Sequence, residues 1–126
     1  MNKPIAIITG ASTGIGRSLA VKLSNQYLVY LISRNRENLN KTKKLINAQN
    51  NDCKIIVSDI SKTESNNDIY SQIENKEKIE LLINNAGIGI FKNITDTTIK
   101  DWDNTFNTNL RGSFLMTKMV IDDLKT

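Results

Sequence analysis

The stretch Thr9-Gly10-Ala11-Ser12-Thr13-Gly14-Ile15-Gly16 decides how this chain folds. A short apolar run, Ile5–Ile8, precedes it and has the character of a buried strand. The residues that follow, Arg17–Leu23, carry two leucines four positions apart and predict a helix packed on a sheet. A strand, a glycine-rich turn and a helix in this order let the backbone approach a phosphate closely, because the first N–H groups of a helix are free.

The glycine spacing leaves two interpretations open. It is G-x-x-x-G-x-G, with one residue more between the first two glycines than the G-x-G-x-x-G fingerprint of dinucleotide-binding loops. The simpler interpretation is a turn in which the glycines only supply positive φ angles. The other interpretation is a phosphate-binding loop, and the rest of the chain has to decide between them.

The composition indicates one soluble globular domain. The chain has 126 residues, of which 39% are hydrophobic and 24% are charged. No apolar run is long enough to span a membrane, and Met1–Pro4 leads straight into the first strand, so neither a membrane span nor a signal peptide is expected. The net charge of +4 comes from scattered lysines, which does not favour a nucleic-acid partner.

The rare residue types exclude several kinds of site. The chain has no histidine and one cysteine, Cys53. Histidine-based triads within this chain are therefore excluded, and we expect no metal site. A lone cysteine cannot form a disulfide within the chain, which favours a reducing compartment, the cytoplasm.

Strands and helices alternate along the chain. Three more strands are predicted by continuous β-prone runs, at 27–32, 53–58 and 79–84. Helices are predicted between them, one that is capped by Asn35 or Asn38 and ends near Gln49, and one over about 62–75. This alternation indicates an α/β, doubly wound parallel sheet of the Rossmann type. Because four strands are little more than half of such a fold, we expect residues 1–126 to be a partial, truncated nucleotide-binding domain.

The last quarter of the chain is predicted to be helical. Apolar residues recur there at every fourth position, at Trp102, Phe106, Leu110 and Phe114, and are joined by Leu115, Val120, Ile121 and Leu124. Such a stripe is typical of a helix face that packs into a core. We therefore expect the stripe to be mainly core, but with no fifth strand beside the fourth, we expect Phe114, Leu115 and their neighbours to face water or a partner.

Four motifs in a fixed order point to a known family. They are Thr9-Gly10-x-x-x-Gly14-x-Gly16, Asp59 after the third strand, Asn84-Asn85-Ala86-Gly87 after the fourth, and Asn107-Thr108-Asn109-Leu110-x-Gly112 in the last helix. Together they make the chain, from Lys3 to about Lys125, resemble the short-chain dehydrogenase/reductase family of oxidoreductases on a Rossmann fold. The resemblance implies hydride transfer between a dinucleotide cofactor and an alcohol or carbonyl substrate. The sequence does not identify that substrate.

The resemblance also implies roles for individual residues. The glycine loop would lie under the cofactor pyrophosphate, with the hydroxyls of Ser12 and Thr13 and the N–H groups of Ile15 and Gly16 as donors. The cofactor-binding residues that the resemblance implies in this loop are Gly10, Ser12, Thr13, Gly14, Ile15 and Gly16.

Two further segments would contact the cofactor. Asp59 would accept a hydrogen bond from the adenine amino group, with the backbone of Ile60 nearby, and the alternative for Asp59 is a simple cap at the strand end. The segment Asn85, Ala86 and Gly87 would run along the ribose. Asn109 would be the active-site asparagine, whose kinked helix holds a water in a proton relay.

Ser33 and Arg34 end the second strand, where the adenosine ribose would lie. An acidic side chain there accepts hydrogen bonds from the 2′-hydroxyl of NAD, whereas an arginine matches the 2′-phosphate of NADP. The first acidic residue is Glu37, so we expect NADP(H) in preference to NAD(H), with extra charge from Arg17. The alternative is that Arg34 is only a loop cation.

The family's catalytic Tyr-x-x-x-Lys pair has no counterpart in this sequence, since none of the three tyrosines has a lysine four positions later. We expect the chain alone to be inactive, and three hypotheses remain. The chain is part of an oxidoreductase whose second half is elsewhere, or a non-catalytic module that binds NADP(H), or an unstable gene remnant. The first predicts a separate C-terminal half, and the second predicts a homologous full-length subunit that docks at the open sheet edge. The resemblance also implies that the helix ending this chain often packs in a dimer interface.

Overall fold

One parallel sheet organises the residues that the computed structural model describes, 2–124. Met1, Lys125 and Thr126, at the ends of the predicted domain, lie outside the described residues. The strands are β1 (Ile5–Thr9), β2 (Leu28–Ser33), β3 (Cys53–Val57) and β4 (Ile79–Ile83). They pair in the order β3-β2-β1-β4, all in parallel. Each predicted strand is confirmed, with ends that differ by one residue at most.

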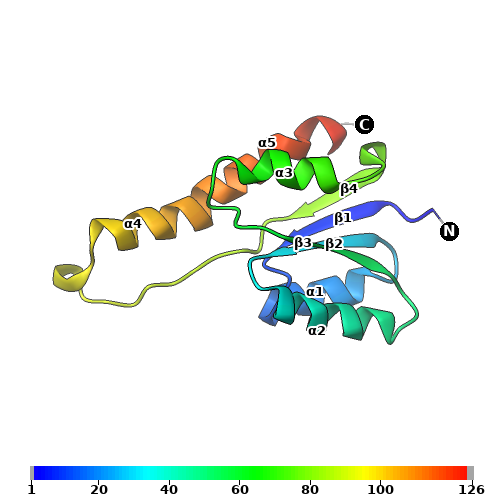
Figure 1. Ribbon diagram of the computed structural model, residues 1–126, viewed down its shortest axis with the longest axis horizontal. Coiled ribbons are helices and arrows are strands. Elements are labelled where there is room, and N and C mark those ends of the chain that lie inside the picture. The colour runs from blue at the N-terminus through cyan, green and yellow to red at the C-terminus, as the bar shows by residue number, and fades with distance from the viewer. Residues whose placement is uncertain (1, 125–126) are drawn as a thin grey trace.

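The helices form a layer on each face of the sheet. They are α1 (Gly14–Leu23), α2 (Arg36–Asn47), α3 (Ser65–Gln72), α4 (Ile99–Phe106) and α5 (Gly112–Leu124). Three short helical segments connect them: η1 (Lys76–Lys78), η2 (Ile94–Asp96) and the π-helical η3 (Asn107–Arg111). Figure 1 shows α1 and α2 on one face and α3 and α5 on the other. The predicted α/β fold of the Rossmann type is thereby confirmed.

The core has two halves, because successive strand residues point to opposite faces. Ile5 and Ile7 belong to the half beneath α3 and α5, whereas Ala6 and Ile8 belong to the half beneath α1 and α2. Every residue of β1 is buried. A central strand covered on both faces explains the continuous apolar run in the sequence.

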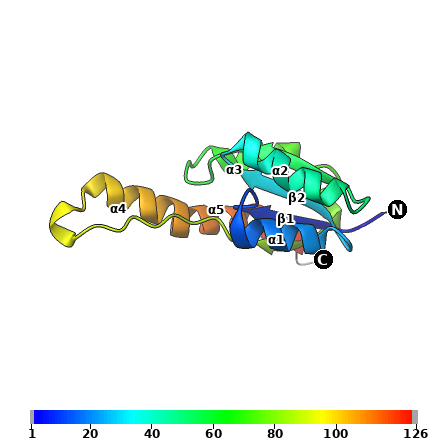
Figure 2. The same cartoon turned by 90° about the horizontal axis from the view of Figure 1, so that it is seen from below.

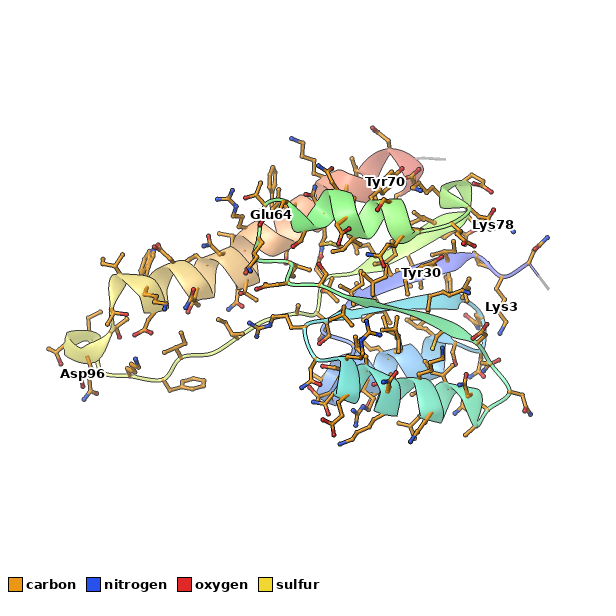
Figure 3. The ribbon with its side chains drawn as sticks, in the orientation of Figure 1. Lys3, Tyr30, Glu64, Tyr70, Lys78 and Asp96 are labelled. Carbon is orange, nitrogen blue, oxygen red and sulfur yellow. The ribbon has the colours of Figure 1, made fainter. Side chains whose placement is uncertain are left out.

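Polar side chains fix the ends of the helices. Asn35 caps α2, because its Oδ1 accepts a hydrogen bond from the Asn38 N–H at 3.0 Å, which decides between the two predicted caps. On the other face, the Tyr70 hydroxyl of α3 donates to Asp123 of α5 at 3.0 Å. Figure 3 shows Tyr70 on α3, with Tyr30 over the sheet, where the Tyr30 hydroxyl accepts from the Glu74 N–H.

The expectation of a core stripe was wrong for Trp102, Phe106 and Leu110, whereas Phe114 faces outward as expected. The exposed fractions of Trp102, Phe106, Leu110 and Phe114 are 59%, 43%, 64% and 62%. Of the residues expected to join them, Ile121 is 39% exposed and Val120 is buried. The buried side of the same helix also repeats every four residues, at Thr108, Gly112, Met116 and Val120.

Gly112 allows one side of this helix to pack closely on the residues after β3. A Cβ atom added at Gly112 would lie 2.9 Å from Ile60 Cδ1, so the glycine is what lets α5 approach the end of β3. A repeat of four drifts around a regular α-helix, which has 3.6 residues per turn. The π-helical η3 has more residues per turn than an α-helix, and this compensates the drift. Both stripes therefore keep their sides through η3.

Residues 91–106, which we call the arm, project from the body of the molecule. Figures 1 and 2 both show the chain running outward after β4 and returning as α4, and Figure 3 places Asp96 at the tip. Every residue from 91 to 100 is exposed. A capping box joins Thr98 and Asp101, and Lys92 pairs with Asp101 at 2.9 Å.

None of the helices between residues 2 and 124 combines the length and apolar character that a membrane crossing requires.

Candidate functional site

A cavity of about 410 Å³ opens at the carboxyl ends of the strands. It lies where the chain passes from β1 into α1 and from β4 into the arm, on either side of the point at which the strand order reverses. Ligands of open parallel sheets bind at such a point, and small-molecule sites have volumes of roughly 300–1,000 Å³. All predicted cofactor-binding residues except Gly16 line it, namely Gly10, Ser12, Thr13, Gly14, Ile15, Ser33, Arg34, Asp59, Ile60, Asn85, Ala86 and Gly87.

The glycine loop supplies the floor of the cavity. Gly10 and Gly14 have φ angles of +64° and +57°. Gly16 lies beneath the loop instead of lining the cavity, because a Cβ atom there would overlap the Gly10 carbonyl oxygen. The absence of a side chain at Gly16 thus lets α1 pack closely against the glycine loop.

The start of α1 can receive an anion. Its N-cap residue, Thr13, makes no side-chain capping bond, and the first turn contains no acidic residue. The first N–H groups of a helix lack partners inside the helix and form the positive end of its dipole. Because Thr13, Gly14 and Ile15 line the cavity, this end of α1 adjoins it.

A buried threonine holds the two sides of the cavity together. The Thr9 hydroxyl oxygen accepts hydrogen bonds from the N–H groups of Asn85 and Ala86, at 3.1 and 3.0 Å. The Asn85 side chain donates in turn to the Gly10 carbonyl oxygen at 3.1 Å. The loop after β4 is therefore fixed against the glycine loop.

The end of β2 places a hydroxyl and a cation at the cavity. The Ser33 hydroxyl donates to Ser12 Oγ at 3.0 Å and accepts from the Asn35 N–H. Arg34 lines the cavity and is exposed. Within residues 2–124, no hydrogen bond or ion pair engages its guanidinium, which is thus open to a ligand.

Asp59 is both a cap and part of the cavity wall. Its Oδ1 accepts from the Ser61 N–H at 3.0 Å and from the Ser61 hydroxyl at 2.6 Å. Partial burial alone would raise the pKa of Asp59, but these bonds, with Arg34 and Lys62 nearby, outweigh it and hold the pKa below its ordinary value. Asp59 is therefore a carboxylate at neutral pH.

Asn109 lies in η3, behind the cavity wall. Its Oδ1 accepts from the Ile88 N–H at 2.7 Å, and its Nδ2 donates to the Ile88 carbonyl oxygen at 2.8 Å. The side chain thus fixes the loop after β4 through both backbone polar groups of Ile88. The role of Asn109 in a proton relay stays a prediction.

Four residues of the wall were not predicted: Ile32, Ser58, Ile88 and Thr108. Thr108 is 8% exposed and shares the buried side of the helix with Gly112. It stands inside the motif that contains Asn109, but no sequence signal separates an inward threonine from an exposed one. Arg17, by contrast, does not line this cavity.

The chain's remaining reactive groups stand apart from the cavity. Cys53 begins β3, at the opposite end of that strand, and burial raises the pKa of its thiol to about 11. It is therefore a thiol at neutral pH. Among the described residues, no cluster of three His, Cys, Asp or Glu side chains could hold a metal ion.

The donors and the cation suit an elongated anionic ligand. The glycine loop and the start of α1 can bind phosphate groups at the centre, and Arg34 can bind another at the end of β2. Asp59 adds an acceptor at the end of β3. This donor set fits a phosphorylated dinucleotide.

Comparisons with known proteins identify the family. The family model described as short chain dehydrogenase matches residues 4–126. The chain is 34% identical to a sepiapterin reductase of Chlorobaculum tepidum, over 92% of this chain and 51% of the relative, and 31% identical to an NAD-dependent glycerol dehydrogenase of Listeria innocua, over 92% and 45%. A crystal structure of a metagenomic short-chain oxidoreductase in complex with NADP superposes with a TM-score of 0.90 at 26% identity, covering 96% of this chain and 56% of that one. The chain thus spans about half the length of the curated relatives it matches.

Proposed function

The chain belongs to the short-chain dehydrogenase family, and on this premise we propose that it binds NADP(H) in the cavity at the strand ends. The whole protein would be an oxidoreductase acting on an alcohol or carbonyl substrate. Bound NADP(H) supplies or accepts the hydride in such a reaction. The residues of this chain bind and orient the cofactor.

The binding residues follow from the cavity wall. The amides of the glycine loop and the start of α1 would bind the pyrophosphate, with the hydroxyls of Ser12 and Thr13 beside them. Asp59 and Ile60 would hold the adenine, and the segment Asn85–Gly87 the ribose. Gly16 contributes by packing α1 against the loop.

Arg34 carries the choice of NADP(H) over NAD(H). The relatives include one complex with NADP and one NAD-dependent enzyme, so family membership leaves this choice open. Arg34 is an exposed guanidinium on the cavity wall, and no acidic side chain precedes Glu37 in this segment. A guanidinium binds the 2′-phosphate of NADP in a fork of hydrogen bonds that NAD cannot accept.

We propose that catalysis needs residues outside these 126. The 126 residues contain no Tyr-x-x-x-Lys pair. We propose that this proton-exchanging pair is supplied from outside these residues, that Asn109 supports it, and that this chain alone binds the cofactor without turnover.

The partner surface would be the exposed stripe of Trp102, Phe106, Leu110 and Phe114. Four large apolar side chains are exposed along one side of the helix, with the rings of Trp102 and Phe106 in contact, and exposed apolar surface of this kind is typical of an interface. We propose a homologous subunit as the partner. The buried, unpaired Cys53 suits a reducing compartment, for which we propose the cytoplasm.

The test is a titration of the purified chain with NADPH and, separately, NADH, followed by cofactor fluorescence. We expect saturable NADPH binding that Arg34→Ala weakens about ten- to a hundredfold, the effect of one charge-assisted hydrogen bond or more. NADH binding should change little. Arg36→Ala is the matched control, because Arg36 is exposed and does not line the cavity.

Two results would count against the proposal. A folded chain that binds neither cofactor would refute the proposal that this cavity binds a dinucleotide. Equal affinities for NADPH and NADH, both indifferent to Arg34→Ala, would sink only the preference for NADP(H).

A further inference from the structure

Arg17 makes an unusual set of contacts just behind the glycine loop. Its Nε donates to Thr42 Oγ1 at 3.0 Å, and its Nη2 donates to the carbonyl oxygens of Ser12 and, at 3.2 Å, Asn38. One guanidinium thus joins α1, the glycine loop and α2. From its place just past the last glycine, Arg17 was expected to add charge that favours NADP(H).

Thr42 completes the same cluster from α2. It is fully buried, and its hydroxyl donates to the Ala11 carbonyl oxygen at 2.9 Å. Two successive carbonyl groups of the loop, those of Ala11 and Ser12, are therefore held by side chains of α1 and α2. Neither carbonyl belongs to a strand or a helix.

The direction of a carbonyl fixes the direction of the next amide. In a trans peptide the C=O of one residue and the N–H of the next point in opposite directions, and the described chain has no cis peptide bond. Carbonyls of Ala11 and Ser12 that point to Arg17 and Thr42 turn the N–H groups of Ser12 and Thr13 the other way. Ser12 and Thr13 line the cavity, whereas Arg17 and Thr42 do not.

We propose that Arg17, together with Thr42, is a positioning residue that aims the Ser12 and Thr13 amides at the cofactor pyrophosphate. The inference rests on the proposed cofactor site and assigns Arg17 a different part from Arg34. Arg34 meets the ligand and distinguishes two cofactors. Arg17 orients the backbone amides that would bind the pyrophosphate, which NADP(H) and NAD(H) have in common.

The experiment compares Arg17→Met, Arg17→Lys and Thr42→Val with the unchanged chain. Each is titrated with NADPH, NADH and adenosine 2′-monophosphate, which carries the adenine and the 2′-phosphate but no pyrophosphate. We expect Arg17→Met and Thr42→Val to weaken NADPH and NADH by the same factor, about tenfold for the loss of one or two hydrogen bonds. Binding of adenosine 2′-monophosphate should be unchanged. A general loss of structure would weaken that binding as well.

Arg17→Lys separates geometry from charge. A lysine keeps the positive charge but lacks the planar fork that reaches Thr42 and Ser12 together, so we expect it to bind as weakly as Arg17→Met. Full affinity in Arg17→Lys would mean that the charge acts on the ligand, and would overturn the proposal. Lys22→Met, which removes a charge from the exposed side of α1, is the matched control.

The remaining outcomes are also decisive. If the unchanged chain binds neither dinucleotide, the proposed function fails. If it binds both and Arg17→Met binds equally well, the positioning role alone fails. Should Arg17→Met not fold, as judged by circular dichroism, Arg17→Lys and Thr42→Val carry the test, and normal dinucleotide binding by both would refute it.

Discussion

Asp59 caps a turn and lines the cavity with one side chain. Its Oδ1 closes the turn after β3 by accepting both hydrogen bonds from Ser61, while the residue also forms part of the cavity wall. The simple cap and the adenine contact were alternatives in the sequence. In the structure the cap is present, and it holds the carboxylate at the place where the contact would be made.

The lowered pKa of Asp59 predicts a pH effect on stability. Between the pKa values of the folded and unfolded chains, the unfolded chain binds more protons, so stability rises with pH. The contribution is complete above the ordinary aspartate pKa of about 4 and is lost as the pH falls through the lower pKa of the folded chain. We expect Asp59→Asn to reduce the free energy of unfolding by about 1 kcal/mol at pH 7.

Urea unfolding of both chains between pH 3 and 7 measures this difference. The gap between Asp59→Asn and the unchanged chain should close toward pH 3, while Asp103→Asn, at an exposed position on α4, should show no gap at either end. A gap of constant size across the range would mean that the charge of Asp59 is not its source.

At the scale of the element, the helix that runs through α4, η3 and α5 has two stripes with the same spacing. One consists of Trp102, Phe106, Leu110 and Phe114, and the other of Thr108, Gly112, Met116 and Val120. The larger and more apolar stripe faces outward. The side of the helix that carries Gly112 is the buried one, because the glycine allows a close approach to Ile60.

This arrangement predicts a small loss of stability at one position of α5 and a large loss at a neighbouring position. Phe114→Ala should change the free energy of unfolding by no more than about 0.5 kcal/mol, because an exposed side chain loses little on truncation. Met116→Ala should cost about 2–5 kcal/mol, because Met116 is 1% exposed and its loss leaves a cavity. Denaturant unfolding of the monomeric fraction measures both, and the reverse order of effects would contradict this orientation of the helix.

The elements could be predicted where apolar runs are continuous. β1 and β2 are buried on both faces, so their sequences are apolar without interruption. The polar residues Thr9 and Ser33 show where the two strands end. The orientation of α5 could not be predicted in this way, because two apolar stripes compete and only the packing of Gly112 on Ile60 decides between them. Thr108 was missed for the same reason.

The candidate site was predictable to the extent that it follows the strand ends. Strand ends of a parallel sheet meet at one edge, so residues after β1, β2, β3 and β4 were expected together and line one cavity. Arg17 could not be placed in this way. Its contact with Thr42 depends on how α1 lies against α2, and nothing in either helix sequence alone specifies that.

At the scale of the whole molecule, a packed body carries an exposed arm. Both halves of the core lie between the sheet and its covering helices. All residues from 91 to 100 are exposed, and Phe91 and Ile94 are 97% and 86% exposed. Such a segment unfolds locally at little cost in free energy, whereas the sheet opens only with the whole domain.

Limited proteolysis tests this contrast. Chymotrypsin should cut first after Phe91, and the fragment 1–91 should persist after this cut as long as the piece that carries α5 stays packed on it, because Tyr30 is then still buried in the core. Mass spectrometry of a time course identifies the first cut. A first cut after Tyr27 or Tyr30 would show that the body opens as readily as the arm.

The central place of β1 has a consequence for the synthesis of the protein. Ile5 pairs with Leu28 on one side and with Ile79 on the other. During synthesis at about 5–20 residues per second, one edge of β1 therefore stays unpaired for several seconds until β4 has been made. During that interval an apolar strand with unpaired backbone groups is open to other nascent chains. A ligand cannot relieve this exposure, because the loop that completes the cavity is translated only after β4.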